Sequence, residues 1–276
     1  MKENLISIIT INYNNAKGLL KTIESVVAQT FVDFEYIIID GGSSDASVSV
    51  IEQFGSQINH WVSEPDHGIY NAMNKGIKVA KGDYILFMNS GDFLYNPQVL
   101  QDVFDKMSLE NDLIYGDVLL RHKKNNWERL QVHPEVLPFS YFYKQTICQQ
   151  ACFFKRSLFD RLFYFNESSK ISADWEFLIY AIYIEKVNYQ KVGVLVAVYD
   201  MEGVSSTSEF RSLAAQERED FMALYFPLFK DDYKRLKGYA SPRFSQLKQI
   251  EQSVFLRKIV SVIFKVMLFF IPNKKN

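Results

Sequence analysis

Two acidic motifs, YIIIDGGSSD and GDYILFMNSGD, contain the residue types that suit nucleotide and metal chemistry. Asp40 lies in the first motif and Asp92 in the second, and each follows a short apolar run typical of a buried strand. A strand that ends in an acid and a Gly/Ser turn places its carboxylate at the carboxyl edge of a sheet, where ligands bind in open α/β sheets. Two carboxylates there, without a glycine-rich phosphate loop, suit a ribose contact and a divalent cation that bridges a diphosphate.

The elements that must position these acids alternate along the N-terminal part of the chain. Apolar runs predict strands at residues 5–12, 36–39, 58–64 and 84–88. Periodic apolar residues predict helices at 17–29 and 69–80. The alternation predicts an α/β domain with a mainly parallel, Rossmann-like sheet and flanking helices. Further along, DLIYGDVLL and WERLQVH predict an antiparallel strand pair, and ISADWEFLIYAIY predicts a helix.

Residues beside the predicted strand ends are candidates for holding a base and its ribose. Tyr13 can lie against the face of a base such as uracil, and Asn12 can bond the edge of that base. Asp40 can accept from ribose hydroxyls or a base N–H, and Asp66, in SEPDHG, is a second candidate for this pocket. Asp40 equally fits a structural role in which it closes a turn with the amides of residues 42–44.

Asn89 and Asp92, in MNSGD, are the candidate metal ligands. Mg²⁺ and Mn²⁺ prefer oxygen ligands and share them with phosphate oxygens. A cation here would stabilise the charge that builds on a departing diphosphate. A helix cap or a turn is the structural alternative for Asp92.

Asp174 opens a predicted helix and is the candidate general base, with an ordinary helix-start acid as the alternative. Because a helix N-terminus lowers the pKa of an acid, a partly buried pocket or Glu176 would have to offset that effect. Glu176 points to a different face and is expected to support the site or contact the acceptor. A surface or loop role is expected for the four histidines, which lie at no ligand spacing: His60, His67, His122 and His133.

The motifs SIITINYN, DFEYIIIDGGSSD, SEPDHGIYNAMNKG and GDYILFMNSGD together resemble the family 2 glycosyltransferases. The resemblance is closest to the branch that builds bacterial surface polysaccharides such as colanic acid, capsules and O-antigens. It is dense over residues 5–95 and thinner as far as residue 206. It implies a GT-A fold and an inverting single displacement on a nucleotide-activated sugar, with a UDP-sugar as the expected donor.

The resemblance also implies roles for individual residues. NSGD stands where the family keeps its D-x-D metal motif, so Mn²⁺ or Mg²⁺ is the expected cofactor, and Asp174 stands at the catalytic-base position. Tyr13 and Asp40 fall at nucleoside-contacting positions, and Asp66 completes that pocket. The expected donor-site residues are Asn12, Tyr13, Asp40, Asp66, Asn74 and Ser90. The expected acceptor-side or supporting residues are Gln149, Gln150, Trp175 and Glu176.

The chain departs from the family pattern at two motifs. Asn89-Ser90-Gly91-Asp92 replaces D-x-D, which leaves open which side chain holds the metal. Relatives often show Cys-His-Gln where this chain has Cys148-Gln149-Gln150, so any role of that histidine passes to Gln149 or is lost.

Composition and charge divide the chain into a catalytic domain and a basic extension. We expect a catalytic domain at 1–206, with a nucleotide-binding half at 1–95 and an acceptor-binding half at 96–206, and a helical extension at 207–276. From Asp231 onward there are ten Lys/Arg and three acidic residues, a net charge of +7, so the remainder carries −8. This asymmetry indicates an anionic partner.

Segment 254–272 combines a broad apolar surface with basic residues, which suits a helix lying in the membrane interface. The alternative is a helix docked on the catalytic domain or in a dimer interface. No apolar run reaches the roughly 18 residues that span a bilayer, and no signal peptide opens the chain. We therefore expect a cytoplasmic protein, peripheral on the inner face of the membrane, with Cys148 and Cys152 as reduced thiols.

The expected acceptor is a polyprenyl-linked or growing saccharide, no nucleic-acid partner is expected, and the oligomeric state is open. A nucleotidyltransferase would need a glycine-rich basic loop near the N-terminus, which INYNNAKG does not match. A dehydrogenase would need G-x-G-x-x-G after the first strand. Because the D-x-D motif is incomplete, an inactive sugar-nucleotide-binding or scaffold subunit remains as the alternative function.

Overall fold

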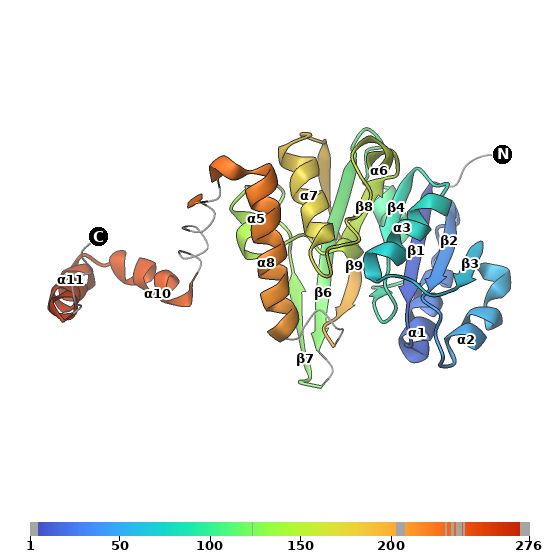
Figure 1. Cartoon of the computed structure of the whole chain (residues 1–276), viewed down its shortest axis with the longest axis horizontal. Coiled ribbons are helices and arrows are strands. Elements are labelled where there is room, and N and C mark those ends of the chain that lie inside the picture. The colour runs from blue at the N-terminus through green and yellow to red at the C-terminus, as the bar shows by residue number, and fades with distance from the viewer. Residues whose placement is uncertain are drawn as a thin grey trace. The chain divides into compact units, whose positions relative to one another are not determined.

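The computed structural model describes residues 5–122, 124–202, 208–229, 231–232, 235, 239 and 241–270. The chain divides into two compact units, Met1–Tyr225 and Phe226–Asn276. The first unit has a nine-stranded sheet with helices on both faces (Figure 1). It extends past residue 206 because helix α8 (Ser208–Tyr225) packs on helix α7 (Ala173–Tyr183).

The N-terminal half of the sheet consists of parallel strands, as the alternating pattern predicted. In spatial order they are β3 (His60–Ser63), β2 (Phe34–Asp40), β1 (Ile6–Asn12) and β4 (Tyr84–Phe87). The chain adds β2 and β3 on one side of β1 and then crosses to place β4 on the other side. The loops therefore diverge between β1 and β4, and this switch point is where open α/β sheets bind ligands.

The C-terminal half of the sheet is mixed. Strand β8 (Cys152–Lys155) runs antiparallel to β4 and to β6 (Leu113–His122), and β9 (Tyr189–Asp200) runs parallel to β6. Strand β7 (Trp127–Gln131) pairs antiparallel with β6, which confirms the predicted strand pair. The two-residue strand β5 (Phe93–Leu94) pairs with β9 and is too short for an apolar pattern to predict.

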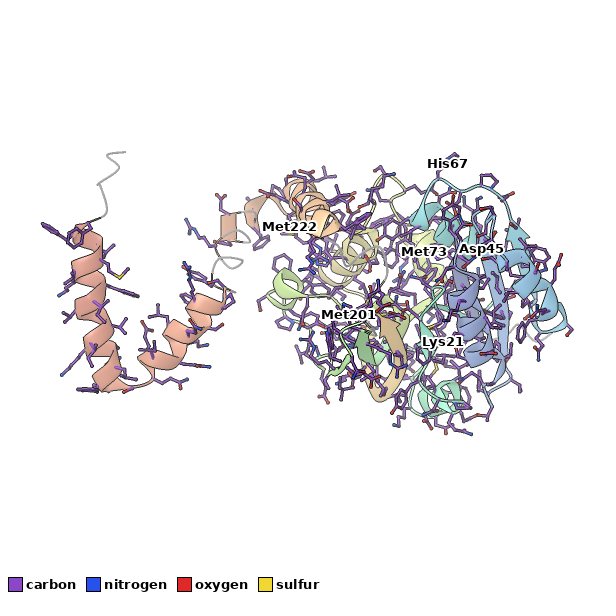
Figure 2. All side chains as sticks on the ribbon, turned by 90° about the horizontal axis from the view of Figure 1, so that it is seen from below. Lys21, Asp45, His67, Met73, Met201 and Met222 are labelled. Carbon is purple, nitrogen blue, oxygen red and sulfur yellow. The ribbon has the colours of Figure 1, made fainter. Side chains whose placement is uncertain are left out.

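Both faces of the parallel strands are covered, which explains why their sequences are almost continuously apolar. On one face lie α1 (Ala16–Val27) and α2 (Ser47–Gln53), which pack on β1, β2 and β4. On the other face lies α3 (Ile69–Val79), which approaches so closely that a Cβ on Gly76 would lie 2.5 Å from Cγ2 of Ile9. Met73 of α3 is buried, whereas His67 just before α3 is exposed (Figure 2).

The remaining short elements of the first unit are α4 (Val99–Phe104), α5 (Tyr141–Lys144), α6 (Ser157–Arg161), η1 (Gly55–Gln57) and η2 (Gln149–Ala151). Aromatic side chains from α6, β4, α7 and the loop before α7 form the core under α7. Phe159 and Phe177 stack with ring centroids 4.7 Å apart, and Phe87 and Phe165 lie against them. This packing fixes the start of α7, which carries Asp174.

The second unit contains η4 (Pro227–Phe229), α10 (Pro242–Glu251) and α11 (Val254–Phe269). None of the residues of α11 is buried. The helix covers most of the predicted membrane segment, of which residues 271–272 lie outside the described part of the chain. No helix in the described residues has both the length and the apolar character needed to cross a membrane.

Candidate active site

The loops that follow β1 and β2 are fastened to each other at the carboxyl edge of the sheet. Asn14 adopts a left-handed backbone conformation, with φ of 48°. Its side-chain Oδ1 accepts from the Ser44 amide at 2.8 Å, and its own amide donates to Oγ of Ser43 at 2.8 Å. This clasp leaves the Tyr13 side chain 66% exposed at the loop. Tyr13 therefore presents a flat aromatic surface of the kind that a nucleoside base can stack on.

Asp40 is fully buried at the end of β2, and both of its carboxylate oxygens are engaged. Oδ1 accepts from Nδ2 of Asn12 at 2.7 Å and from Oγ of Ser43 at 2.6 Å. Oδ2 accepts from the Ser43 amide at 2.9 Å and from Oγ of Ser63 at 2.6 Å. Burial favours the neutral acid, but these hydrogen bonds outweigh it and lower the pKa of Asp40. Asp40 thus closes the turn that the structural alternative described, and it also joins the ends of β1, β2 and β3.

Tyr13 and Asp66 meet above Gly41. A Cβ on Gly41 would lie 2.5 Å from Oδ2 of Asp66 and 3.3 Å from Cδ2 of Tyr13. The other Asp66 oxygen accepts from the Gly68 amide at 3.0 Å, which holds the loop before α3. Because Gly41 has no side chain, an aromatic ring and a carboxylate can both lie close to its backbone, and these two groups suit a base and its hydrogen-bonding edge.

The NSGD segment lies across the switch point and is held by α1. Thr22 Oγ1 donates to the Asp92 carbonyl at 2.6 Å and accepts from the Gly91 amide at 3.0 Å. Asn15 Nδ2 donates to the Ser90 carbonyl at 3.1 Å, and Ser90 Oγ donates to the Asn15 carbonyl at 3.3 Å. Ser90 is therefore positioned beside the β1 loop, next to the expected nucleotide pocket.

The Asp92 carboxylate is 6% exposed and bridges the NSGD segment to two distant elements. Oδ2 accepts from Nε2 of Gln150 at 2.8 Å, and Oδ1 accepts from the Asp200 amide at 2.8 Å. Burial raises the pKa of Asp92 to about 7, although both hydrogen bonds act in the opposite direction. The charge of Asp200 at the end of β9 also raises this pKa, so the two carboxylates are neighbours.

The residues at this position fit a divalent cation only in part. Oδ1 of Asn89 is buried and has no hydrogen-bond partner. This oxygen is therefore free to bind a cation. Asp92 adds a carboxylate that faces the same segment. Within the residues that the structure describes, no three Asp, Glu, His or Cys side chains converge as a metal cluster. A cation here would therefore need oxygen ligands from a bound diphosphate, as Mg²⁺ commonly does.

Asp174 is partly buried in the first turn of α7 and contacts the opposite half of the domain. Its Oδ1 accepts from the Tyr70 hydroxyl at 3.2 Å, and Tyr70 lies at the start of α3. Burial raises the pKa of Asp174, while the charge of Arg218 and the Tyr70 hydrogen bond act against it. Burial is therefore the effect that offsets the helix N-terminus, as the sequence required.

Glu217 of α8 holds the segment that leads into α7. Its two oxygens accept from the amides of Lys170 at 2.6 Å, Ile171 at 3.2 Å and Ser172 at 3.0 Å. Ser172 is the N-cap of α7, so its amide is one that the helix itself leaves without a partner, and the other two amides precede it. Glu217 thereby fixes the backbone immediately before Asp174.

The two residues next to Asp174 have structural partners. Trp175 is fully buried and donates from Nε1 to the Phe142 carbonyl at 3.1 Å, so it acts on the site only through its neighbours. Glu176 is buried, and its oxygens accept from Ser169 at 2.9 Å and Asn166 at 3.3 Å. Burial raises the pKa of Glu176. A contact between Glu176 and an acceptor stays a prediction.

Asn74 and Gln149 are also buried with partners inside the protein. Asn74 joins α3 to the loop that precedes α7, through hydrogen bonds with the backbone of Phe165 and with Glu167. Its amide group is saturated by these bonds, so a nucleotide contact would require it to rearrange. Gln149 donates from Nε2 to the Met73 sulfur at 3.6 Å. Both side chains thus support α3, which carries Tyr70.

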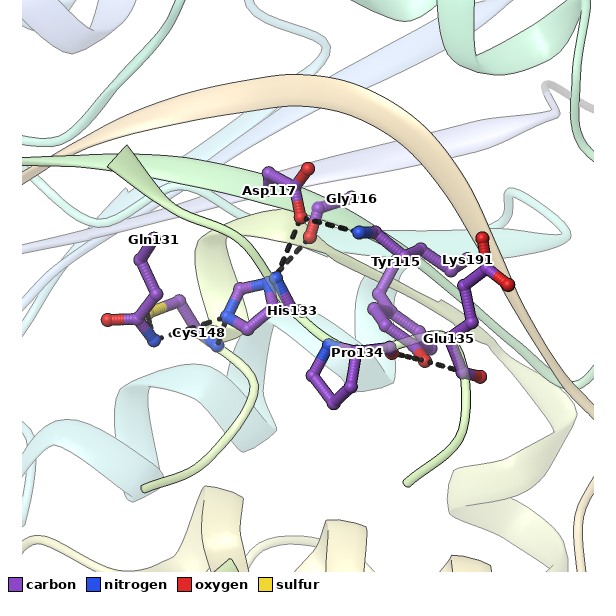
Figure 3. A network of polar contacts seen from close by, with 9 residues as sticks. All are labelled: Tyr115, Gly116, Asp117, Gln131, His133, Pro134, Glu135, Cys148 and Lys191. Atoms are coloured by element: carbon purple, nitrogen blue, oxygen red, sulfur yellow. Dashed lines mark hydrogen bonds and ion pairs between the residues drawn. The ribbon is translucent and has the colours of Figure 1, made fainter. Parts of the chain in front are cut away.

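The segment that carries Gln150 is anchored by a buried histidine (Figure 3). A surface or loop role was expected for His133; it lies in the loop after β7, but it is fully buried and not at the surface. Its Nδ1 lies 2.7 Å from the Gly116 carbonyl, and its Nε2 accepts from the Cys148 amide at 3.2 Å. Asp117 accepts from the His133 amide at 2.8 Å and pairs with Lys191 at 3.3 Å. The histidine is buried because all of its polar atoms find partners, and burial lowers its pKa.

Asp92 and Asp174 both lie close enough to Cys148 for their charges to act on its thiol. Burial raises the pKa of Cys148, and the charges of Asp174 and Asp92 both raise it further. Cys148 and Cys152 are free thiols, as expected. The structure therefore brings the metal-motif acid and the candidate base to one region, although they are far apart in the sequence.

Several residues of this site were not found from the sequence. Asp200 follows a strand in the same manner as Asp40 and Asp92, so its pattern could have identified it. Tyr70 and Glu217 lie inside helical patterns, where a polar residue normally indicates only a solvent face. Their partners are 104 and up to 47 residues away along the chain.

We predict that Asp92→Asn changes how stability depends on pH. The folded-state pKa of Asp92 is raised to about 7, so the stability linked to its protonated form is present at low pH and is lost as pH rises through 7. Asparagine cannot ionise, so the melting temperature of the variant should rise relative to the wild type between pH 5 and pH 8. The difference corresponds to on the order of 2–4 kcal/mol.

The measurement is a melting series without nucleotide and with a chelator, with Asp102→Asn as the control because Asp102 is exposed. The control should keep a constant offset from the wild type. Parallel curves for Asp92→Asn and the wild type would contradict the assignment of a buried, raised-pKa carboxylate at this position.

Comparison with known proteins identifies the family. Residues 7–163 match the model of the family described as Glycosyl transferase family 2. A PGL/p-HBAD biosynthesis glycosyltransferase of Mycobacterium bovis is 32% identical over 213 residues, which cover 75% of this chain and 81% of the relative. An uncharacterized glycosyltransferase of Mycobacterium tuberculosis is 33% identical over 215 residues, which cover 74% of this chain and 78% of the relative.

Solved structures with the same architecture have lower sequence identity. Staphylococcus aureus TarS in complex with UDP-GlcNAc has a TM-score of 0.60 at 18% identity, covering 84% of this chain and 70% of that chain. The mannosyltransferase PcManGT from Pyrobaculum calidifontis, in complex with GDP-Man and Mn²⁺, has a TM-score of 0.62 at 15% identity, covering 97% and 81%. These likenesses show the GT-A fold. The chain belongs to glycosyl transferase family 2 and is a glycosyltransferase.

Proposed function

We propose that this glycosyltransferase moves a sugar, with inversion, from a nucleotide sugar to a lipid-linked saccharide of a bacterial surface-polysaccharide pathway. The proposal depends chiefly on the 3.2 Å hydrogen bond between Tyr70 and Asp174. This bond joins a partly buried carboxylate of the acceptor half to the helix that follows the nucleotide-binding loop. Burial raises the pKa of this carboxylate despite the hydrogen bond, which suits a base beside the donor edge.

The donor is a nucleotide sugar, with UDP as the first choice of nucleotide. Tyr13 stacks on the base, Asp66 binds the base or ribose, and Asp40 holds the pocket's loops through its hydrogen bonds from Asn12 and Ser43. Two solved structures of the same fold support a nucleotide-sugar donor, because one holds UDP-GlcNAc and the other holds GDP-Man with Mn²⁺.

A divalent cation completes the donor site. Asn89 and Asp92 are the residues that would hold it, together with oxygens of the nucleotide diphosphate. When bound, the cation supplies positive charge against the charge that develops on the departing diphosphate. The unpaired Oδ1 of Asn89 supports this role.

Asp174 removes the proton from the acceptor hydroxyl as the hydroxyl oxygen bonds to the anomeric carbon. The bond from that carbon to the diphosphate oxygen breaks on the opposite face, and its electron pair leaves with the diphosphate. The raised pKa makes Asp174 a better proton acceptor than an exposed aspartate. Tyr70 orients the carboxylate, and Glu217 fixes the backbone that carries it.

The test of the donor site is a thermal-shift panel with UDP, GDP, dTDP and CMP, each with and without Mn²⁺. We expect UDP with Mn²⁺ to raise the melting temperature most, since a ligand at a hundred times its dissociation constant adds about 2.7 kcal/mol. Tyr13→Ala should lower this shift because it removes the exposed ring above Gly41. Tyr95→Ala is the matched control, since Tyr95 is 46% exposed elsewhere. A panel without any shift would contradict the proposed donor.

We predict that Asp174→Asn retains the nucleotide-induced shift but lowers transfer by at least about a hundredfold, because the amide cannot accept the proton. Transfer is measured as label moved from the nucleotide sugar into an organic-extractable lipid fraction. Asp160→Asn, an exposed aspartate on α6, is the matched control and should transfer normally. Normal transfer in Asp174→Asn would remove this residue from the role of base.

We also propose that α11 lies on an anionic membrane surface, which would place the protein at the cytoplasmic face of the cell membrane, near a lipid-linked acceptor. Lys258, Ser261 and Lys265 are spaced so that they share one side of the helix. The exposed apolar side chains lie on the side of the helix that adjoins this one: Phe255, Ile259, Val262, Ile263, Val266 and Phe269. Such a helix binds the interface through apolar burial and through attraction to anionic lipids.

The full-length chain should therefore sediment with vesicles that contain anionic lipid. The double change Lys258→Glu and Lys265→Glu should weaken this binding by about tenfold or more, since each basic residue near the surface contributes about 1 kcal/mol. Removal of residues 240–276 should abolish it. Neutral vesicles and high salt are the controls, because both reduce the electrostatic attraction. Equal sedimentation of all variants would show that the membrane contact lies elsewhere or is absent.

A further inference from the structure

Arg218 of α8 is a cation beside the candidate base, and among the described residues it has no hydrogen-bond or ion-pair partner. Its guanidinium carbon lies 5.1 Å from the centre of the Trp175 ring. Its Nε atom is buried and makes no hydrogen bond. Its charge lowers the pKa of Asp174, so it lies near that carboxylate. Trp175 is itself fully buried, so the stacked guanidinium is held against a rigid surface.

The acidic residues around Arg218 have all found other donors. Asp174 accepts from Tyr70, and Glu217 accepts from three backbone amides. Glu176 accepts from Ser169 and Asn166. Within the described part of the chain, no ion pair or hydrogen bond is recorded for Arg218. A buried donor without a partner costs stability, and such a group in a native protein calls for an explanation such as a ligand.

The position of Arg218 indicates whether an anion bound to it would come from the donor or from the acceptor. In an inverting displacement, the attacking oxygen and the departing diphosphate lie on opposite faces of the anomeric carbon. The base contacts the attacking oxygen, so a group beside the base lies on the acceptor side. The donor diphosphate is therefore the wrong partner for Arg218, whereas an anion carried by the acceptor is within its region.

We propose that Arg218 binds a phosphate group of the acceptor, close to the sugar whose hydroxyl attacks. A guanidinium stacked on an aromatic ring presents its N–H groups as a planar fork, which matches two phosphate oxygens. This inference rests on the proposed function, because it uses both the inverting geometry and the role of Asp174. It adds to that function a requirement for a phosphate ester or diphosphate next to the acceptor sugar.

The test is calorimetric titration of the full-length protein with three probes: farnesyl diphosphate, farnesol and inorganic pyrophosphate. Saturating UDP and Mn²⁺ occupy the donor site, and UDP binding is measured first. The titrations are repeated without UDP, so a failure of UDP to bind, which would contradict the proposed function, leaves the comparison of variants intact. The variants are Arg218→Gln, Arg218→Lys and, as a matched control on the same helix, Arg211→Gln.

We expect farnesyl diphosphate to bind the wild type and farnesol to bind far more weakly. Arg218→Gln should weaken binding of the diphosphate by about tenfold or more, the usual effect of losing a hydrogen bond to a charged group. Arg218→Lys should weaken it less, and Arg211→Gln should not change it. Comparable binding of pyrophosphate would assign the site to the phosphate groups, whereas a clear preference for farnesyl diphosphate would assign it to the lipid-linked form.

Melting temperature separates this role from a structural one. If Arg218 is kept for a ligand, Arg218→Gln should melt at or above the wild-type temperature, because it removes an unpaired buried donor. A lower melting temperature with unchanged diphosphate binding would make Arg218 a packing residue and overturn the proposal. Equal binding of farnesol and farnesyl diphosphate, or binding of neither to the wild type, would overturn it as well.

Discussion

The donor edge of the sheet depends on one buried carboxylate. Asp40 accepts four hydrogen bonds, from Asn12, from the amide and hydroxyl of Ser43, and from Ser63. An ionised carboxylate can be buried only when its oxygens are satisfied in this way. The requirement forces the ends of three parallel strands and the turn after β2 into one arrangement. Tyr13, Gly41 and Asp66 lie around that arrangement, so the shape of the proposed nucleotide pocket depends on the hydrogen bonds of Asp40.

The three central aspartates show how burial and hydrogen bonding divide the same chemical group into different roles. Asp40 has four donors, and its pKa is lowered, which makes it a permanent anion suited to holding structure. Asp92 has two donors and deep burial, and its pKa rises to about 7. Asp174 has a tyrosine hydroxyl and a nearby arginine, and its pKa still rises because burial is the larger effect. The two acids with raised pKa values are those assigned to metal and proton chemistry, where a change of charge is part of the function.

The sequence was most informative where a pattern is local. The four parallel strands, the β6–β7 pair and helix α7 were all predicted from apolar periodicity, which reports the face that each element buries. The bond from the Ser43 amide to Asp40 was one of the two interpretations of its sequence, but the bonds from Asn12 and Ser63 could not be predicted, because they come from the ends of two other strands. The 3.2 Å contact between Tyr70 and Asp174 spans 104 residues and exists only once α3 and α7 share a core. The burial of His133 could not be predicted for the same reason, since it depends on hydrogen-bond partners at Gly116 and Cys148.

Glu217 links helix α8 to the backbone that leads into α7. Three consecutive amides before α7 donate to this one side chain, which belongs to α8 rather than to the helix that they precede. Opening of those amides to solvent is therefore governed by whether α8 is seated, and α7 has little influence on it. The local stability of residues 170–172 therefore depends on the stability of α8. Docking of α8 and ordering of the backbone before Asp174, the proposed base, are thus coupled in one equilibrium.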